Sequence, residues 1–254
     1  MNQIFSLGLV CFAVATGCRT APPPATGKNF TCVLVHGAWG GGCDWRHVDQ
    51  LLAADGHTVF RPTLTGQGEH SNLSTTNLDL ATHIQDIVNV ILWENLHDVV
   101  LVGHSYGGMV ITGVADRVPE HIRQLIYLDA LVPTNGESAN DIRPAHIKTI
   151  LQDGYLLAPW VKPNTPPPHD VLMPAKCFSQ PIVLTNQTAA EKIPAAYILT
   201  VDLGHAPETD DFYQFYQRAQ ARGWAVGVMV GDHNVQRSHP QDLVKLIEAA
   251  TTIR

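Results

Sequence analysis

Several features that would assign this chain to other classes of protein are missing from its sequence. Charged residues make up only 15% of it, and 23 acidic residues outnumber 16 basic ones, giving a net charge of -7 and a pI near 6.0. This balance leaves no basic patch, so the sequence predicts no nucleic acid partner. It also has no internal repeat, no P-loop and no zinc-type spacing of cysteine and histidine, and therefore implies no metal and no cofactor.

Cysteine is also scarce, with five residues in the whole chain. Cys11 and Cys18 belong to an apolar N-terminal segment, which leaves Cys32, Cys43 and Cys177 in the remainder. An exported protein can pair two of these three, and the odd number then leaves at least one thiol free. No disulfide is assigned from the sequence.

The N-terminal apolar run, Ile4 to Ala15, is too short to span a bilayer and has the length of a signal-peptide core. It ends in Ala15-Thr16-Gly17-Cys18, which resembles a bacterial lipobox with Cys18 as the lipidated residue. However, Met1-Asn2-Gln3 lacks the usual lysine or arginine, and Ala13-Val14-Ala15 would suit an ordinary signal peptidase. A lipoprotein signal, an ordinary signal peptide and a disordered leader or mis-assigned start therefore remain open.

We expect residues 1–18 to direct export. The expected location is the periplasm, or the membrane of a bacterium through a lipid on Cys18, with secretion as the alternative. Residues 19–29, which include Pro22-Pro23-Pro24, predict a flexible linker. The chain is 45% hydrophobic, and residues 30–254 are numerous enough to bury a full core as one domain.

The most informative motif is Gly103-His104-Ser105-Tyr106-Gly107, which fits G-x-S-x-G. It directly follows Val99–Val102, a β-branched run typical of a buried parallel strand, and it precedes a segment that can open a helix. A sharp strand-to-helix turn exposes the central serine, and the flanking glycines make room for that turn. The motif therefore predicts Ser105 as a nucleophile. The alternative is a glycine-rich turn with a solvated serine, which would match the same sequence motif.

The chain has 13 histidines, so position has to identify a general base among them. His233 follows the apolar run Ala225–Val230, which places it at the carboxyl end of a predicted strand, on the sheet edge that carries the turn. His239 is expected to flank the last helix, and the side chain of His104 is expected to point away from the adjacent nucleophile. His233 is therefore the predicted base.

Two aspartates compete for the role of the acid that orients this base. Asp202 follows the run Ala195–Val201 and fits the chain order serine, acid, histidine, so it is the preferred acid. Asp129 follows Gln124–Leu128 and is the alternative, because some hydrolases carry the acid one strand earlier. If it is not catalytic, Asp129 is a helix cap or a member of a loop ion pair.

An oxyanion hole requires two backbone N–H groups near the nucleophile. One is predicted to come from Tyr106, the residue after the serine. The other is predicted to come from Ala38, in the glycine-rich loop 37–42 that follows the strand Cys32–His36. We interpret His36 as a structural residue that braces this loop.

These motifs resemble the α/β-hydrolase group that contains plant methyl-ester esterases, hydroxynitrile lyases and their bacterial esterase relatives. The similarity runs from about residue 30 to the C-terminus and is weakest between about 140 and 190. It implies Ser105 as nucleophile, His233 as base, Asp202 as acid, and Ala38 and Tyr106 as oxyanion donors. The matching stretches are Val33–Trp39, Pro62–Glu69, Gly103–Gly108 and Gly231-Asp232-His233.

Two positions depart from the lyase branch of this group. Hydroxynitrile lyases carry a threonine where Gly37 stands and a lysine where Asn234 stands, and the lysine stabilises the departing cyanide. Neither group is present here, whereas ester hydrolysis needs neither of them. Lyase chemistry is therefore not expected.

The remaining pattern alternates short apolar runs with helical periodicity, which predicts an α/β fold with a mostly parallel twisted sheet and helices on both faces. Eight prolines between about 136 and 190 interrupt this alternation. We interpret this segment as a cap, inserted after the sixth strand, that roofs a mainly apolar pocket. Residues expected to line the pocket are Trp39, Trp160, Leu172 and Phe178.

The sequence thus predicts a serine carboxylic-ester hydrolase that acts on small to medium apolar or aryl esters through an acyl-enzyme. Two alternatives remain: an amide or lactone hydrolase or a lyase on the same triad, and a non-catalytic binder of small molecules. Intact serine, histidine and aspartate argue against the binder, because binding alone needs no activated nucleophile.

Overall fold

A computed structural model describes residues 29–144, 148–162 and 165–252. The expected export signal, with Cys11 and Cys18, and all but the last residue of the expected linker lie outside the described residues. Of the remaining cysteines, Cys32 and Cys177 are buried and Cys43 is partly exposed, and each of these three is a free thiol.

The centre of the molecule is a six-stranded sheet with the order β2-β1-β3-β4-β8-β9, in which every neighbouring pair is parallel. The inner strands are almost wholly buried, as expected for parallel strands that are covered on both faces. Their carboxyl ends therefore meet at one edge of the sheet. The strands are β1 (Thr31–Val35), β2 (Thr58–Phe60), β3 (Val99–His104), β4 (Ile122–Leu128), β8 (Ala195–Val201) and β9 (Ala225–Val230).

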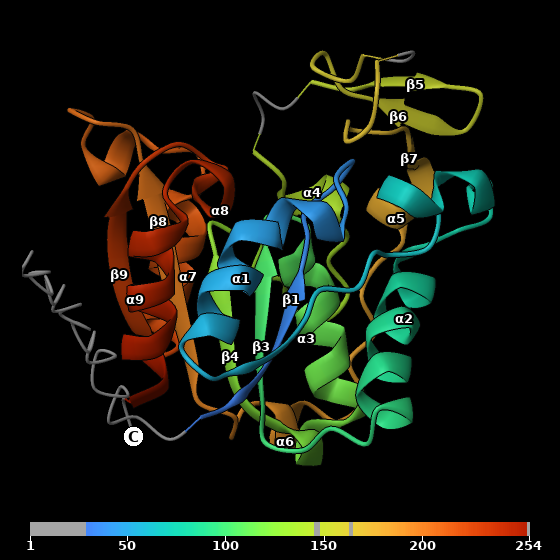
Figure 1. Cartoon of the computed structure of the whole chain (residues 1–254). Coiled ribbons are helices and arrows are strands. Elements are labelled where there is room, and N and C mark those ends of the chain that lie inside the picture. Colours follow the sequence, from blue (N-terminus) through green and yellow to red (C-terminus); the bar gives the residue numbers. More distant parts are fainter. Residues whose placement is uncertain (1–28, 145–147, 163–164, 253–254) are drawn as a thin grey trace, which may run out of the picture.

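Helices cover both faces of this sheet (Figure 1) and bury a separate apolar cluster on each. One face carries α1 (Arg46–Ala54), α8 (Val235–Ser238) and α9 (Pro240–Thr252). The other carries α2 (Leu80–Trp93), α3 (Gly107–Arg117) and α7 (Tyr213–Ala221). This arrangement confirms the predicted α/β class. Among the described residues, no helix is both long and apolar enough to cross a membrane.

Helix α2 shows how the sequence builds these layers. Asp79 caps it by accepting a hydrogen bond from the backbone N–H of Thr82, and apolar residues at helical spacing face the core. The side chain of Ile84 packs against α3 where that helix has Gly113, and a Cβ at Gly113 would lie only 2.3 Å from Ile84 Cδ1. The missing side chain thus lets two helices approach closely beside the strand that leads to the serine.

The chain between β4 and β8 forms an insertion, and its place corrects the sequence-based expectation. Among the described residues it follows the fourth strand along the chain, β4, and not the sixth. Its elements are short, because the prolines interrupt both helices and strands. Three strands pair antiparallel in a small second sheet, which Figure 1 shows above the main one. The elements are α4 (Ala139–Ile142), β5 (Ile150–Gln152), β6 (Tyr155–Leu157), β7 (Met173–Pro174), α5 (Ala175–Ser179) and α6 (Gln187–Ala190).

Short 3-10 helices complete the connections between these elements. Two of them, η1 (Gly42–Trp45) and η2 (Gly68–Leu73), follow β1 and β2 near the edge where the strands end. The others are η3 (Pro119–His121) and η4 (Pro207–Thr209), and both begin with a proline in the first helical turn.

Candidate active site

Ser105 lies in a sharp turn between the end of β3 and the start of α3, with a φ of 53°. A non-glycine residue rarely adopts this left-handed conformation, and such strain is concentrated at functional sites. Two backbone hydrogen bonds hold it: Ser105 N–H donates to the carbonyl oxygen of Leu128 at 3.2 Å, and Leu131 N–H donates to that of Ser105 at 3.0 Å. The structure thus has the elbow that the motif predicts.

The glycines around Ser105 are required by close backbone approaches. A Cβ at Gly107 would lie 2.8 Å from the carbonyl oxygen of Val35, and one at Gly108 would lie 2.0 Å from that of Leu131. Both contacts are with backbone atoms, which cannot move aside as a flexible side chain can. The motif therefore has the glycines that its tight strand-to-helix turn needs.

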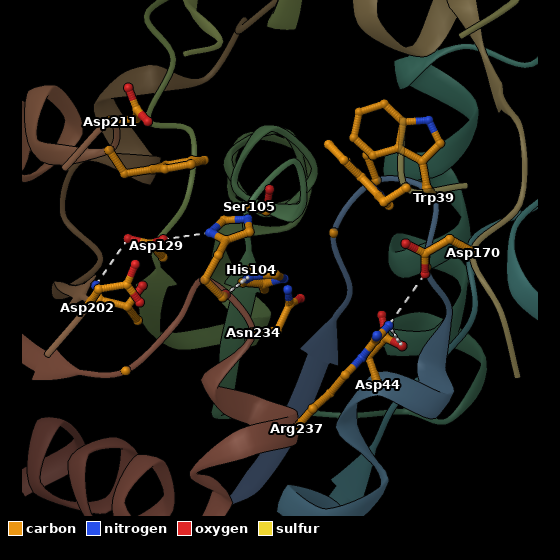
Figure 2. Close-up of a pocket in the computed structure, with 18 of the residues that line it drawn as sticks. Trp39, Asp44, His104, Ser105, Asp129, Asp170, Asp202, Asp211, Asn234 and Arg237 are labelled. Carbon is orange, nitrogen blue, oxygen red and sulfur yellow. Dashed lines mark hydrogen bonds and ion pairs between the residues drawn. The ribbon is translucent and has the colours of Figure 1, made fainter. Parts of the chain in front are cut away.

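The imidazole of His233 is bound by a buried carboxylate. His233 Nδ1 lies 2.6 Å from Oδ2 of Asp129, which is the short distance expected of a charge-assisted hydrogen bond. Asp129 directly follows β4, has a φ of 43° and is 1% exposed. Its other oxygen, Oδ1, accepts the backbone N–H of Thr200 at 3.1 Å. Figure 2 shows Asp129 and Ser105 among the residues that line a pocket.

This geometry corrects the preferred choice of the orienting acid, because the partner of His233 is Asp129 and not Asp202. Both aspartates follow parallel strands and lie at the same edge, so the sequence pattern alone could not separate them. The difference lies in the side chains: Asp202 is exposed, whereas Asp129 leaves its strand in a left-handed conformation that turns its carboxylate toward the imidazole. The alternative acid considered from the sequence is therefore the one that the structure supports.

The expected oxyanion donors border the nucleophile. Tyr106 is the N-cap residue of α3, where the first backbone N–H groups of a helix have no partner within the helix. Ala38 lines the same cavity as Ser105. A Cβ at the adjacent Gly37 would lie 3.1 Å from the Cβ of Ser105, so the loop after β1 runs directly against the nucleophile.

His36 is buried and braces this loop, as the sequence analysis expected. Its Nε2 accepts the backbone N–H of Leu64 at 3.0 Å, and its Nδ1 donates to the carbonyl oxygen of Gly37 at 2.7 Å. Burial lowers the pKa of His36, so the ring stays neutral and keeps one donor and one acceptor. It thereby ties the loop after β1 to the loop after β2.

A cavity of about 710 Å³ opens over Ser105 and His233, a volume suited to a small or medium-sized ligand. Trp39 and Trp160 line it, as expected, with their rings edge to face at 5.2 Å. Leu172 and Phe178 do not line it. Phe178 is 3% exposed and stacks on the ring of Tyr106 beneath the cap, and Leu172 is 42% exposed.

The cavity is also more polar than the sequence analysis expected. Burial raises the pKa of Asp210, and the nearby carboxylates of Asp129 and Asp211 raise it further. Among the described residues, no group of histidine, cysteine, aspartate and glutamate is arranged to hold a metal ion. The charged residues that line the cavity are Asp44, Asp129, Lys162, Asp170, Asp202, Asp210, Asp211 and Arg237.

Sequence reasoning missed Arg237, which connects three parts of the cavity wall. Its Nη2 lies 2.5 Å from Oδ1 of Asp44, in the turn that follows the oxyanion loop, and 3.5 Å from Oδ1 of Asp170, in the cap (Figure 2). A backbone hydrogen bond of 2.8 Å, from Val171 N–H to the carbonyl oxygen of Trp39, joins the same two segments. The available signal was its spacing, since Arg237 follows His233 by about one helical turn.

Comparisons with known proteins agree with this architecture. A carbendazim hydrolyzing esterase of Nocardioides sp. (strain SG-4G) is 54% identical over 116 residues, which are 46% of this chain and 47% of that protein. Methylesterase 1 of Arabidopsis thaliana is 33% identical over 126 residues, 49% of this chain and 48% of the relative. The chain thus spans about half the length of the curated relatives it matches.

A solved structure and a family model cover far more of the chain. An extracellular α/β-hydrolase from a Paenibacillus species superimposes with a TM-score of 0.72 at 23% identity, over 87% of this chain and 98% of that one. This likeness shows the fold. The model of the alpha/beta hydrolase family matches residues 32–246. On the strength of that match, the chain belongs to the α/β-hydrolase family.

Proposed function

We propose that the chain is a serine carboxylic-ester hydrolase that works through an acyl-enzyme. The observation that carries the proposal is one arrangement: Ser105 in a left-handed turn, facing the cavity that His233 also lines, with His233 bound at 2.6 Å by the buried Asp129. A binding protein has no physical need for this combination, whereas an acyl-transfer enzyme needs each part of it.

In the proposed reaction, His233 Nε2 takes the proton from the Ser105 hydroxyl while its oxygen attacks the ester carbonyl. The imidazolium then protonates the leaving alcohol, and His233 activates a water that releases the acid. Asp129 accepts a hydrogen bond from Nδ1–H of His233, which fixes the tautomer with its lone pair on Nε2 and stabilises the charged ring.

The developing oxyanion is proposed to be held by the backbone N–H groups of Ala38 and Tyr106. One lies in the loop after β1 and the other at the start of α3, so the two come from separate parts of the chain. Each preorganised donor of this type raises turnover by a factor of about 10² to 10³, because it stabilises the negative charge that develops in the transition state.

The cavity wall supports small to medium esters that carry an aromatic part. The edge-to-face pair of Trp39 and Trp160 offers a surface on which a flat ring can pack. The charged side chains elsewhere in the cavity favour substrates that also carry polar groups. The relative at 54% identity is named for hydrolysing carbendazim, so this compound belongs in the first substrate panel.

Hydrolysis of p-nitrophenyl esters from acetate to octanoate, and of carbendazim, tests the proposal, with Ser105→Ala assayed beside the natural chain. We expect turnover in the natural chain and loss of it in the variant, and the optimal acyl length measures the usable part of the cavity. Equal turnover by both proteins would refute a role for Ser105.

We also propose that residues 1–18 direct export to the periplasm, with lipid anchoring at Cys18. The support is the apolar run followed by Ala15-Thr16-Gly17-Cys18. Mass spectrometry of the mature protein tests this, with Cys18→Ala as the control. A lipid-modified Cys18 at the new N-terminus is expected, and cleavage after Ala15 without lipid would contradict the anchor.

A further inference from the structure

His104, the residue before the nucleophile, joins the elbow to the loop that carries the base. Its side chain is 3% exposed, and its Nε2 lies 2.7 Å from the backbone carbonyl oxygen of His233. The two imidazole rings lie 4.6 Å apart between their centres. The expectation that His104 turns away from Ser105 is therefore incomplete, because the ring is turned toward the backbone of His233.

Gln236 and the backbone carbonyl oxygen of His233 together determine which nitrogen of His104 carries the proton. The amide nitrogen Nε2 of the fully buried Gln236 lies 3.3 Å from His104 Nδ1. An amide nitrogen only donates and a carbonyl oxygen only accepts, so the neutral ring accepts at Nδ1 and donates from Nε2 to His233. Burial, together with the neighbouring His233, lowers the pKa of His104 well below its usual value, which keeps the ring neutral.

Other contacts hold the segment around His233 and its imidazole. Gly231 N–H donates to the carbonyl oxygen of Val201 at 2.9 Å on one side, and Asn234 N–H donates to Oδ1 of Asp232 at 2.6 Å on the other. The imidazole itself is held by the bond from Nδ1 to Asp129 and by the ring of Phe212, which stacks on it with the ring centres 4.8 Å apart. The hydrogen bond from His104 adds a further contact, which holds the backbone carbonyl group of His233.

We propose that His104 is a positioning residue that fixes the distance between the Ser105 hydroxyl and the His233 imidazole. The proposal rests on the proposed function, because it concerns the proton transfer from Ser105 to His233. His104 is bonded covalently to Ser105 and hydrogen-bonded to His233, so its side chain is the shortest link between nucleophile and base. A misplacement of about 1 Å at such a contact can cost about 10²-fold in rate.

Three variants of the full chain test this role: His104→Leu, His104→Gln and Gln236→Leu. His104→Leu removes the donor, whereas the amide nitrogen of His104→Gln can replace Nε2. Gln236→Leu removes one of the two groups that select the tautomer and leaves the His233 carbonyl oxygen in place. Gln124→Leu is the matched control, because Gln124 is also a buried glutamine, and it donates to the carbonyl oxygen of Ala250 on a remote helix.

For an ester that the natural chain hydrolyses, we expect His104→Leu to lower kcat by about 10- to 10²-fold with KM changed by less than about twofold. Gln236→Leu should lower kcat less, His104→Gln should recover most of it, and Gln124→Leu should leave it unchanged. If His104→Leu fails to fold, two comparisons of kcat still test the positioning role. One compares Gln236→Leu with Gln124→Leu, and the other compares His104→Gln with the natural chain.

The proton on His233 Nδ1 gives a readout that needs no substrate. Held against Asp129, it should produce a far-downfield NMR signal in the natural chain, and this signal should move or broaden in Gln236→Leu and His104→Leu but not in Gln124→Leu. Natural kcat and an unmoved signal in both His104 and Gln236 variants would overturn the positioning role. If instead the natural chain shows no Ser105-dependent turnover, the proposed function fails, and the NMR comparison still tests the link.

Discussion

Asp129 reaches the base because it leaves β4 in a left-handed backbone conformation, which strand propensity does not reveal. Its carboxylate is buried and accepts two hydrogen bonds, from the His233 ring and from the Thr200 N–H. Asp202 follows β8 but is exposed. The same conservative substitution, aspartate to asparagine, is therefore expected to change kcat differently at the two positions.

Asp129→Asn should lower kcat by about 10⁴-fold, because the amide can donate to His233 Nδ1 and stabilise the wrong tautomer. Asp202→Asn should change kcat by less than about threefold, since no proton transfer of His233 depends on it. Steady-state kinetics on one p-nitrophenyl ester measures both. Full activity in Asp129→Asn with loss in Asp202→Asn would restore the assignment made from the sequence.

The parts of the site that could be predicted from the sequence are those that local pattern determines. Ser105 follows a β-branched run and is flanked by glycines, and His233 follows the last strand, so both positions were predicted from neighbouring residues. The choice of acid, the ion pairs of Arg237 and the link through His104 depend on contacts between residues far apart in the chain. No local pattern carries that information.

At the scale of the element, the strands that lead to the site were predicted well because each is a short apolar run. Helix α2 begins and ends close to its apolar stripe, and β8 and β9 match their predicted runs. The prolines predict an irregular segment between about 136 and 190, but two of the expected pocket residues, Leu172 and Phe178, do not line the cavity. Apolar side chains in short, irregular segments have no periodic face, so Phe178 faces Tyr106 and the core instead of the cavity.

The contact between α2 and α3 depends on the absence of a side chain at Gly113. Gly113→Ala should lower the free energy of unfolding by about 1–3 kcal/mol, because the new Cβ would overlap Ile84 in a fully packed layer. Gly227→Ala is the matched control, since a Cβ there would meet no atom within 4 Å. Urea denaturation measures both. A loss of stability only in Gly227→Ala would contradict the packing argument.

Arg237 connects the cap to the turn after the oxyanion loop. Its two partners, Asp44 and Asp170, differ in burial and in their distance from the guanidinium. Asp44 is 8% exposed, so Arg237→Gln leaves a buried carboxylate without its cation and should cost about 1–3 kcal/mol of stability. Asp170→Asn breaks only the longer contact, at 3.5 Å, and should cost less than about 1 kcal/mol.

Chemical denaturation of the two variants in low and high salt measures these costs. The larger loss should belong to Arg237→Gln. If Asp170→Asn lowers the stability as much as Arg237→Gln does, the contact of Arg237 with Asp170, and not the contact with Asp44, provides the stabilisation.

At the scale of the whole molecule, buried histidines make the fold sensitive to acid. Burial lowers the pKa values of His36 and His104, and it lowers that of His83 to about 4. Each ring holds two segments together in its neutral form; His83, for example, contacts the Tyr106 hydroxyl at Nδ1 and the Thr65 carbonyl oxygen at Nε2. Protonation would put a charge in a buried site, and in His36 and His104 it would also break the hydrogen bond that a ring nitrogen accepts.

The sign of the effect follows from proton binding. Below the unfolded pKa near 6.5, the unfolded chain binds a proton at His83 that the folded chain does not bind until about pH 4. The stabilisation is therefore complete above pH 6.5 and is lost as the pH falls toward 4, on the order of 3 kcal/mol for His83 alone. Urea midpoints between pH 7 and 4.5 should fall, and His83→Gln should flatten the slope. His47→Gln, at an exposed site, should leave it unchanged.

Covalent labelling by a serine-directed phosphonate, followed by intact-protein mass, tests the central claim most directly, because it needs no knowledge of the natural substrate. The account predicts one adduct on the natural chain, located at Ser105, none on Ser105→Ala and slow labelling of Asp129→Asn. A natural chain that stays unlabelled, or a Ser105→Ala variant that is labelled as fast as the natural chain, would contradict the assignment of an activated serine to this site.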